Sequence, residues 1–372
     1  MSKLLRLLAI NVGVGTSVLL LALGAMEGYL RVRLDPKYAP RPIFIDRNEK
    51  TGWATSANLH HVFYAPDYAI EIVTDQHGYR LGARGPARPD DRLVVLVGDS
   101  YTFGWGVSTA DTFASYLDEA LATVDARLRV VNTAVSGFAT LSYADRLAEF
   151  ISRFGTGQID SIFVLHVDND PADNVDYLLF RSGFYEPRVD PGYSPRSTLR
   201  VWNLLRHTWM ARGPMAPPEY DVNFRYPMAR TARTAGPLRI DGEEFGDFDD
   251  YDMTRETSVP QSKASKHLTP LQLRLMRLGL RRINCAAPNG GLTVHHAIIN
   301  LADSYTIYAD AMAEAFDGMP SCGNTIKYHG LIPLTAAQLA IPAHNTHSGG
   351  HFTPAFNKVY AEILLRLIVD DR

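Results

Sequence analysis

The chain carries no excess of positive charge. Its 37 Lys and Arg residues are balanced by 40 Asp and Glu residues, which gives a net charge of −3 at neutral pH. Nucleic-acid binding draws much of its affinity from basic side chains that neutralise phosphates, so no nucleic-acid partner is indicated. The sequence also lacks a dinucleotide-binding fingerprint and a P-loop, and we expect no organic cofactor.

Cysteine is scarce. Cys285 and Cys322 are the two in the sequence. In an oxidising compartment they could close a loop and restrict the unfolded chain, a contribution of roughly 3–4 kcal/mol. They could equally be two unrelated buried thiols, because spacing says nothing about proximity. Neither lies near the N-terminal segment, which excludes lipoprotein processing.

One long apolar run stands out near the N-terminus. No charged residue occurs from Leu7 to Met26, and a helix of that length would match the roughly 30 Å hydrocarbon thickness of a bilayer. The run is longer than the apolar region of most signal peptides, which favours a retained membrane anchor, residues 1–30. A cleaved signal ending at the small residues around Leu23 and a buried core helix remain alternatives. Basic residues flank both ends, so charge leaves the orientation undecided.

The remainder predicts a lead-in followed by one α/β domain. Residues 31–90 are rich in Pro and Tyr, and the alternating stretch 68–74 predicts a strand. From residue 91 onward, short apolar runs alternate with amphipathic segments, which predicts a three-layer α/β/α domain over 91–372 with a parallel sheet. Predicted strands cover 93–97, 128–131, 161–167 and 293–299, and predicted helices cover 112–124, 141–154, 269–285, 303–316 and 353–368.

Residues 175–267 break this alternation. They contain many Pro, Arg and Asp residues and an acidic run, 247–252. We interpret them as an insertion or an elaborated loop region over the core. Calcium binding by the acidic run is disfavoured because its ligands show no ordered spacing.

The sharpest chemical signal is Gly98-Asp99-Ser100, directly after the predicted strand 93–97. Ligands of open α/β sheets bind beyond the carboxyl ends of the strands. A serine at such a strand-to-helix turn can act as a nucleophile if a base lies beside it. The tripeptide by itself is equally compatible with a turn that only caps a helix, and we expect the Asp99 carboxylate to order the turn rather than to act in chemistry.

Four segments together resemble the conserved blocks of the SGNH/GDSL hydrolase family, in particular its bacterial membrane-anchored members. They occur in the family's order and cover roughly residues 20–174 and 268–372, so that the insertion is unmatched. Parts of the lead-in, 25–31, 51–53 and 77–80, also resemble these anchored proteins. The four segments are 98–107 (block I), 132–140 (block II), 167–170 (block III) and 349–354 (block V).

The resemblance implies a flavodoxin-like SGNH hydrolase fold and a role for each matched residue. Ser100 would be the nucleophile and His351 its base. The backbone N–H groups of Ser100 and Gly137 and the amide of Asn169 would form the oxyanion hole. The substrate would be an ester or an O-acylated glycan, with O-acetyl groups as one option, and the catalytic body would lie on the periplasmic side of the inner membrane.

One position departs from the family's pattern. An acid usually stands two or three residues before the base, and here Ser348 and Gly349 occupy those positions. A Ser–His dyad, an acid from elsewhere and a catalytically weak site therefore all remain open. His344 and His347 add two histidines near His351, but no zinc-binding spacing accompanies them, and we expect no metal.

Three functions fit this sequence. The first is an envelope esterase that removes O-acyl groups from a glycan. The second is a polysaccharide O-acetyltransferase that uses the same site, and the third is a non-catalytic protein that binds a glycan or a partner, which the missing acid motivates. His166, in the predicted strand 161–167, is expected to be a core or rim residue whose ring nitrogens have hydrogen-bond partners, rather than a second base.

Overall fold

The computed structural model describes residues 3–33, 45–64, 69–187, 201, 228–256, 268–299, 305–342 and 351–372. The chain forms two compact units. The first comprises residues 1–43, 62–69 and 190–220, and the second comprises residues 44–61, 70–189 and 221–372.

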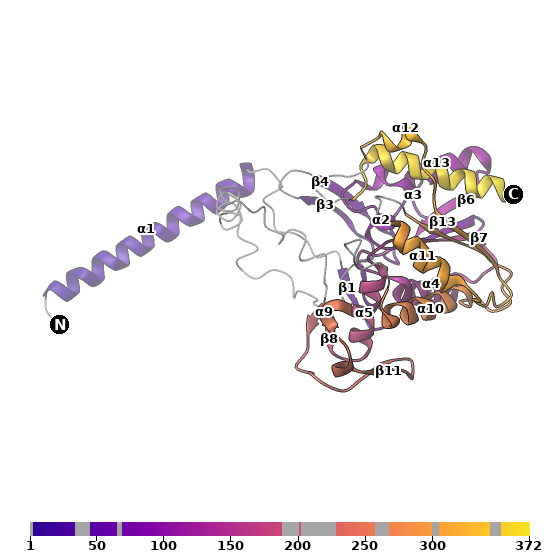
Figure 1. Cartoon of the computed structure of the whole chain (residues 1–372). Coiled ribbons are helices and arrows are strands. Elements are labelled where there is room, and N and C mark those ends of the chain that lie inside the picture. The colour runs from indigo at the N-terminus through magenta and orange to yellow at the C-terminus, as the bar shows by residue number, and fades with distance from the viewer. Residues whose placement is uncertain are drawn as a thin grey trace. The chain divides into compact units, whose positions relative to one another are not determined.

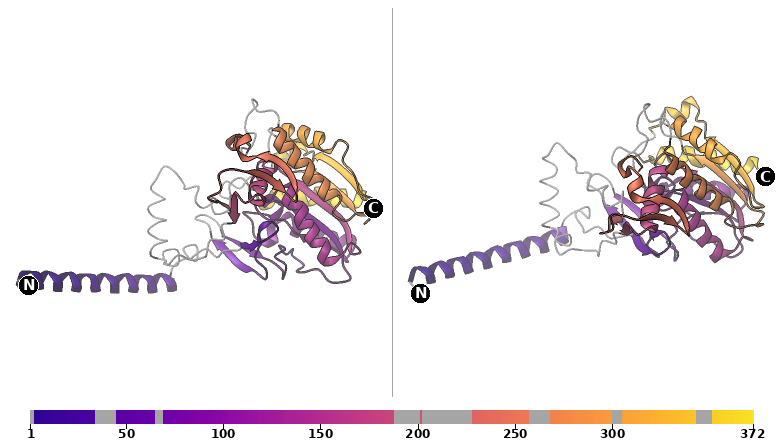
Figure 2. Two further views of the ribbon diagram at one scale, coloured as in Figure 1. Left: turned by 90° about the horizontal axis from the view of Figure 1, so that it is seen from below. Right: turned by 60° about the horizontal axis from the view of Figure 1, so that its bottom comes forward.

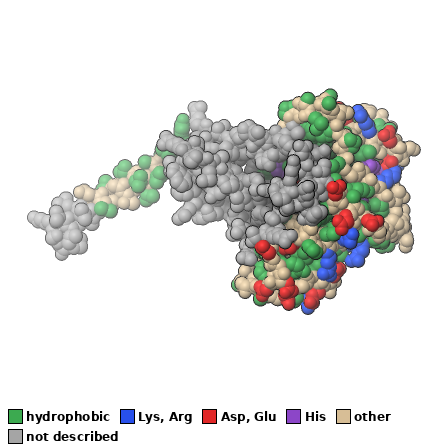
Figure 3. Space-filling view, viewed as in Figure 1, with side chains coloured by type: hydrophobic (Ala, Val, Ile, Leu, Met, Phe, Trp, Pro, Cys, Tyr) green, Lys and Arg blue, Asp and Glu red, His purple; other side chains and the backbone are tan. Residues whose placement is uncertain are grey.

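The first unit contains helix α1 (Lys3–Arg33) (Figure 1). Its segment Ile10–Val32 is long and apolar enough to cross a membrane, with a mean hydropathy of 1.6. No residue of its most apolar stretch is buried. Figure 3 shows hydrophobic side chains along this helix, and Leu21 is 74% exposed. The predicted apolar helix is therefore confirmed, and the same features also suit a signal sequence.

The second unit is built on a five-stranded parallel sheet. Its order, β13-β12-β7-β5-β6, places the first strand in the chain between the second and the third, as in doubly wound sheets. A crevice for ligands is expected where the strand order reverses, beyond the carboxyl ends of β5 and β7. The strands are β5 (Arg92–Gly98), β6 (Leu128–Asn132), β7 (Ile159–His166), β12 (Thr293–Ile298) and β13 (Thr325–Leu331).

Helices cover both faces of this sheet (Figures 1 and 2). Successive side chains of a strand point to opposite faces of the sheet, and the side chains of β5 pack into a core on each face. Val94 and Leu96 enter a core cluster with α3 and α13, whereas Leu93, Val95 and Val97 enter a second cluster with α4 and α10. The predicted α/β fold with a parallel sheet between helices is confirmed. The helices are α3 (Phe113–Val124), α4 (Thr140–Phe154), α10 (Pro270–Asn284), α11 (Tyr305–Phe316) and α13 (Pro354–Asp370).

Side-chain caps explain where three of these helices begin. The hydroxyl of Thr112 accepts from the backbone N–H of Ser115 at the start of α3, and Thr353 caps α13 in the same way. At α10, Thr269 and Gln272 satisfy each other's backbone N–H groups at 3.1 Å. This arrangement is a capping box.

The structure adds elements that periodicity did not predict. Strand β13 is half-buried from Ile326 to Leu331 and contains Gly330, which blurs its pattern. Helix α5 (Asp170–Arg181) occupies the first residues of the predicted insertion and packs Val175 and Leu178 into a core cluster with α10. Further short elements of the described chain are η2 (Thr109–Asp111), β8 (Tyr185–Pro187), β9 (Met228–Arg230), β10 (Pro237–Ile240), β11 (Glu243–Asp247), η3 (Phe248–Asp250), α9 (Met253–Glu256) and α12 (Ala336–Leu339).

The lead-in folds into short strands. β1 (Ile45–Asn48) and β2 (Gly52–Thr55) form an antiparallel hairpin. They are followed by β3 (His60–Tyr64) and β4 (Ala69–Val73), the latter confirming the strand expected over 68–74. Ile70 and Ile72 of β4 are buried, as their alternation predicts.

Cys285 and Cys322 form a disulfide, with 5.1 Å between their Cα atoms. Cys285 ends α10, and Cys322 lies in the turn before β13. The pairing that the sequence left undecided is therefore made by the fold.

Candidate active site

Ser100 lies at the point where β5 turns into a single helical turn, α2 (Ser100–Phe103). Gly98 ends the strand, and a Cβ there would come within 2.1 Å of Oγ1 of Thr102, so this turn requires glycine. Asp99 caps α2, because its Oδ1 accepts a hydrogen bond from the backbone N–H of Tyr101 at 2.9 Å. Ser100 is thereby held at the carboxyl end of β5, where ligands of such sheets bind.

The fold brings His351 to Ser100 across 251 positions of sequence. Nε2 of His351 lies 2.7 Å from Oγ of Ser100, within the distance that a general base needs. The imidazole lies against the ring of Tyr101, with 4.6 Å between the ring centroids. Phe352 and the Thr353 cap fix the chain just after the histidine, because one is buried in the core and the other begins α13.

Asp99 is completely buried behind the serine, and its Oδ2 lies 3.2 Å from Oγ of Ser100. Burial raises the pKa of this carboxyl to about 8, and the nearby charge of Asp170 adds to the increase. This shift favours the protonated carboxyl at neutral pH. The O–H of the protonated form can donate to Oγ and leave the serine's own hydrogen for His351, whereas the ionised carboxylate accepts from the Ser100 hydroxyl.

The loop after α2 is held by a buried arginine from the lead-in. The guanidinium of Arg80 donates to the backbone carbonyls of Phe103, Gly104 and Val107 at 2.7–2.9 Å. Burial lowers its pKa to about 9, so it remains charged at neutral pH. Because each acceptor belongs to the block I segment, this side chain fixes the loop that follows Ser100.

The two further oxyanion-hole candidates follow the neighbouring strands. Gly137 lies in the loop after β6 with φ = 78°, a conformation that favours glycine. Its N–H has no hydrogen-bond acceptor within the described ranges. Asn169 follows β7 and precedes α5, where its side chain does not cap the helix. Its Nδ2 donates to Oδ2 of Asp173 at 2.6 Å, which leaves one amide hydrogen for a ligand.

A buried polar network lies beneath the segment that carries Asn169. The carboxyl of Asp170 accepts from the hydroxyls of Tyr143 at 2.8 Å and Tyr308 at 3.2 Å. Nδ1 of His166 lies 3.2 Å from the same carboxyl, and Nε2 of His166 lies 3.0 Å from His296. His166 is fully buried and hydrogen-bonded, which agrees with its predicted place in the core.

Sequence reasoning did not assign a role to Asp170, Asp173 or Tyr143. One signal was available for Asp173, which stands four residues after Asn169 and so shares a face of α5 with it. Tyr143 carried no signal, because its hydroxyl meets Asp170 only through the packing of α4 against α5.

Several predictions fall on residues outside the described ranges. Ser348 and Gly349, where the family's acid would stand, are among them, as are His344 and His347. Across the described part of the chain, no group of three His, Cys, Asp or Glu residues is arranged to hold a metal ion.

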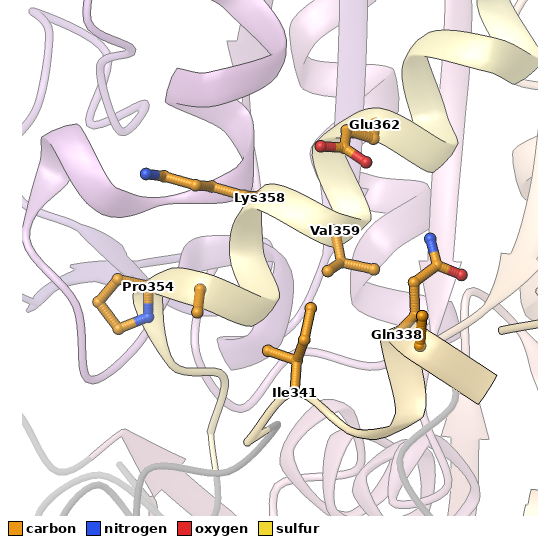
Figure 4. Close-up of a pocket in the computed structure, with 8 residues that line it drawn as sticks. Gln338, Ile341, Pro354, Lys358, Val359 and Glu362 are labelled. Atoms are coloured by element: carbon orange, nitrogen blue, oxygen red, sulfur yellow. The ribbon is translucent and has the colours of Figure 1, made fainter. Parts of the chain in front are cut away.

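A groove of about 420 Å³ lies between α12 and the first turns of α13 (Figure 4). Pro354 at its edge closely follows His351 in the chain, but neither His351 nor Ser100 lines it, and we assign no chemistry to it. Its lining residues include Gln338, Ile341, Pro354, Lys358, Val359 and Glu362.

No family model matches the chain, and the search of curated proteins gives no match. Solved structures show a distant likeness. LAE5, described as an alpha/beta hydrolase enzyme from the metagenome of Lake Arreo, Spain, is 13% identical with a TM-score of 0.36, over 75% of this chain and 95% of that one. A mutant of the esterase AlinE4 is 12% identical with a TM-score of 0.33, over 77% and 97%.

A third structure is an acetyl xylan esterase from the rumen bacterium Butyrivibrio proteoclasticus. It is 12% identical with a TM-score of 0.33, over 75% of this chain and 64% of that one. Likenesses at these scores carry no argument about chemistry.

Proposed function

We propose that this protein is a serine ester hydrolase of the SGNH type, with Ser100 as the nucleophile and His351 as the base. The observation that carries the proposal is the 2.7 Å approach of Nε2 of His351 to Oγ of Ser100. A serine hydroxyl is a weak nucleophile until a base takes its proton. Two residues so distant in sequence meet at the sheet edge where ligands bind, which supports a reactive pair over a simple helix-capping turn.

The proposed reaction has two stages. Oγ of Ser100 attacks the acyl carbon while its proton passes to Nε2 of His351, and the carbonyl oxygen becomes an oxyanion. The backbone N–H groups of Ser100 and Gly137 and the free amide hydrogen of Asn169 stabilise that charge, each by about 3 kcal/mol. His351 then returns the proton to the departing alkoxide, which leaves an acyl-serine. Water activated by the same histidine hydrolyses this ester and releases the acid.

The proposed substrate is an O-acyl group, such as acetyl, on a glycan of the cell envelope. This part rests on the resemblance of the four sequence blocks to the SGNH/GDSL family. We place α1 as a retained anchor in the inner membrane, with the catalytic body on the periplasmic side. The Cys285–Cys322 disulfide supports an oxidising compartment.

The test is hydrolysis of p-nitrophenyl acetate by the full chain in detergent. Ser100→Ala and His351→Ala should each lower kcat by at least about a thousandfold, and the double variant should be no worse than either, because the two groups act as one unit. His60→Ala is the matched control, since that side chain is 71% exposed in the lead-in, and it should retain activity.

Other outcomes separate the remaining functions. Acetate that appears on a glycan acceptor rather than in solution would favour transfer over hydrolysis. A folded wild-type chain that neither hydrolyses the ester above the Ser100→Ala background nor reacts with a fluorophosphonate would refute the proposal and favour a binding protein.

A further inference from the structure

The lead-in hairpin reaches the backbone of the candidate oxyanion hole. Trp53, in β2, is only 4% exposed, and its indole Nε1–H donates a hydrogen bond to the backbone carbonyl of Ser136 at 3.0 Å. Ser136 directly precedes Gly137, whose N–H is the proposed oxyanion donor. The bond joins residues 83 positions apart.

The carbonyl of Ser136 and the N–H of Gly137 belong to the same peptide unit. That unit is planar and trans, so the carbonyl and the N–H point in opposite directions. A donor fixed on the carbonyl therefore fixes the direction of the N–H on the other side. It also polarises the unit, because hydrogen bonds in a chain strengthen one another in a low-dielectric interior.

The indole is itself held firmly. Its ring packs edge-on against Phe138, with centroids 5.4 Å apart and an interplanar angle of 72°. Within the hairpin, Oγ1 of Thr51 donates to the backbone carbonyl of Trp53 at 2.8 Å. Trp53 thus contacts the residue on each side of Gly137, through a hydrogen bond to Ser136 and through ring packing on Phe138.

We propose that Trp53 is a positioning residue for the Gly137 oxyanion donor, and that the lead-in is part of the active-site framework rather than a tether. The inference rests on the proposed ester hydrolysis. An oxyanion donor acts mainly in the transition state, so loss of its alignment should lower kcat and leave KM nearly unchanged.

Trp53→Phe removes the N–H and keeps an aromatic ring against Phe138. We expect kcat for p-nitrophenyl acetate to fall about tenfold, less than the 10²–10³ that follows removal of a whole donor, with KM within about twofold of wild type. Asn48→Ala is the matched control. It removes the hydrogen bonds that Oδ1 of Asn48 accepts from the backbone N–H groups of Lys50 and Thr51 in the same hairpin, leaves the indole N–H in place and should retain kcat.

A spectroscopic readout tests the same bond without catalysis. Labelling the full chain with ¹³C-carbonyl serine and ¹⁵N-glycine selects the three Ser–Gly pairs, at 136–137, 182–183 and 348–349. Trp53→Phe should move the Gly137 amide resonance and leave that of Gly183 in place, and Gly137→Ala assigns the signal by its loss.

The outcomes separate this inference from the proposed function. An active wild type together with an unchanged kcat in Trp53→Phe would overturn the role of Trp53 and leave ester hydrolysis standing. An inactive wild type would overturn both, because there would be no oxyanion to position. A Gly137 resonance that does not move in Trp53→Phe would overturn the inference whatever the activity.

Discussion

Replacing Asp99 with asparagine should change how the stability of the protein depends on pH. The native pKa of this buried carboxyl is raised from 3.8 to about 8. Between pH 5 and pH 7 the folded protein therefore keeps the proton and the unfolded chain has lost it. The contribution of this carboxyl to the free energy of unfolding of the wild type is fully present below about pH 4. It declines as the pH rises and is lost by about pH 8.

The magnitude follows from one proton. Unfolding that releases one proton lowers the free energy of unfolding by about 1.4 kcal/mol for each pH unit, or about 2.7 kcal/mol from pH 5 to pH 7. Asparagine does not titrate, and its amide can donate to Oγ of Ser100 and accept from Tyr101 as the protonated acid does. From pH 5 to pH 7, the free energy of unfolding of Asp99→Asn should therefore rise by that amount relative to that of the wild type.

Urea unfolding of the full chain in non-ionic detergent, followed by tryptophan fluorescence, measures this difference at both pH values. Asp125→Asn is the control, because a backbone hydrogen bond from Arg127 lowers the pKa of the half-buried Asp125 carboxyl, so its difference from wild type should not vary over this range. A difference between Asp99→Asn and wild type that is equal at pH 5 and pH 7 would refute the reasoning, since Asp99 would then be ionised in the native protein.

The same proton should affect activity. An ionised Asp99 can only accept, and it would compete with His351 for the single hydrogen of the Ser100 hydroxyl. Ester hydrolysis by the wild type should therefore decline as pH rises past about 8, while Asp99→Asn keeps its rate. Rates are taken after subtraction of the Ser100→Ala background, and parallel pH profiles would contradict this role of Asp99.

Two further predictions concern the oxyanion hole and the disulfide. Asn169→Ala should lower kcat for p-nitrophenyl acetate by about 10²–10³, because one donor is lost, whereas Asp173→Asn should have a smaller effect; equal losses would place Asp173 among the direct contacts. Replacing Cys285 and Cys322 together with serine should lower the free energy of unfolding by roughly 3–4 kcal/mol. Urea unfolding measures this, and an unchanged midpoint would show that the link does not restrict the unfolded chain.

Periodicity predicted most of the regular structure. Phe113, Leu117 and Leu121 are spaced for one helical face, and all three are fully buried. The capping threonines at 112, 269 and 353 stand where their helices begin. These features are local, because burial on one side and unpaired terminal N–H groups act within a few residues, so sequence alone reveals them.

Strand β13 and helix α5 show the limit of that reasoning. After the exposed Thr325, β13 is half-buried at every position and gives no clean alternation. Helix α5 begins in a segment rich in Asp and Asn, whose mixed composition hides its buried face. Which neighbour covers each of these elements is decided by the sheet order, and no local pattern encodes that order.

For the site, the tripeptide Gly98-Asp99-Ser100 by itself was equally compatible with a turn that only caps a helix. The resemblance of the four blocks named Ser100 with His351 as its base, and Gly137 and Asn169 as oxyanion donors. Tertiary structure decided that Nε2 of His351 lies within hydrogen-bond distance of Ser100 and that Trp53 holds the peptide before Gly137. Hydrogen bonds span about 3 Å in space whatever the separation along the chain, so only the folded arrangement determines which polar groups meet.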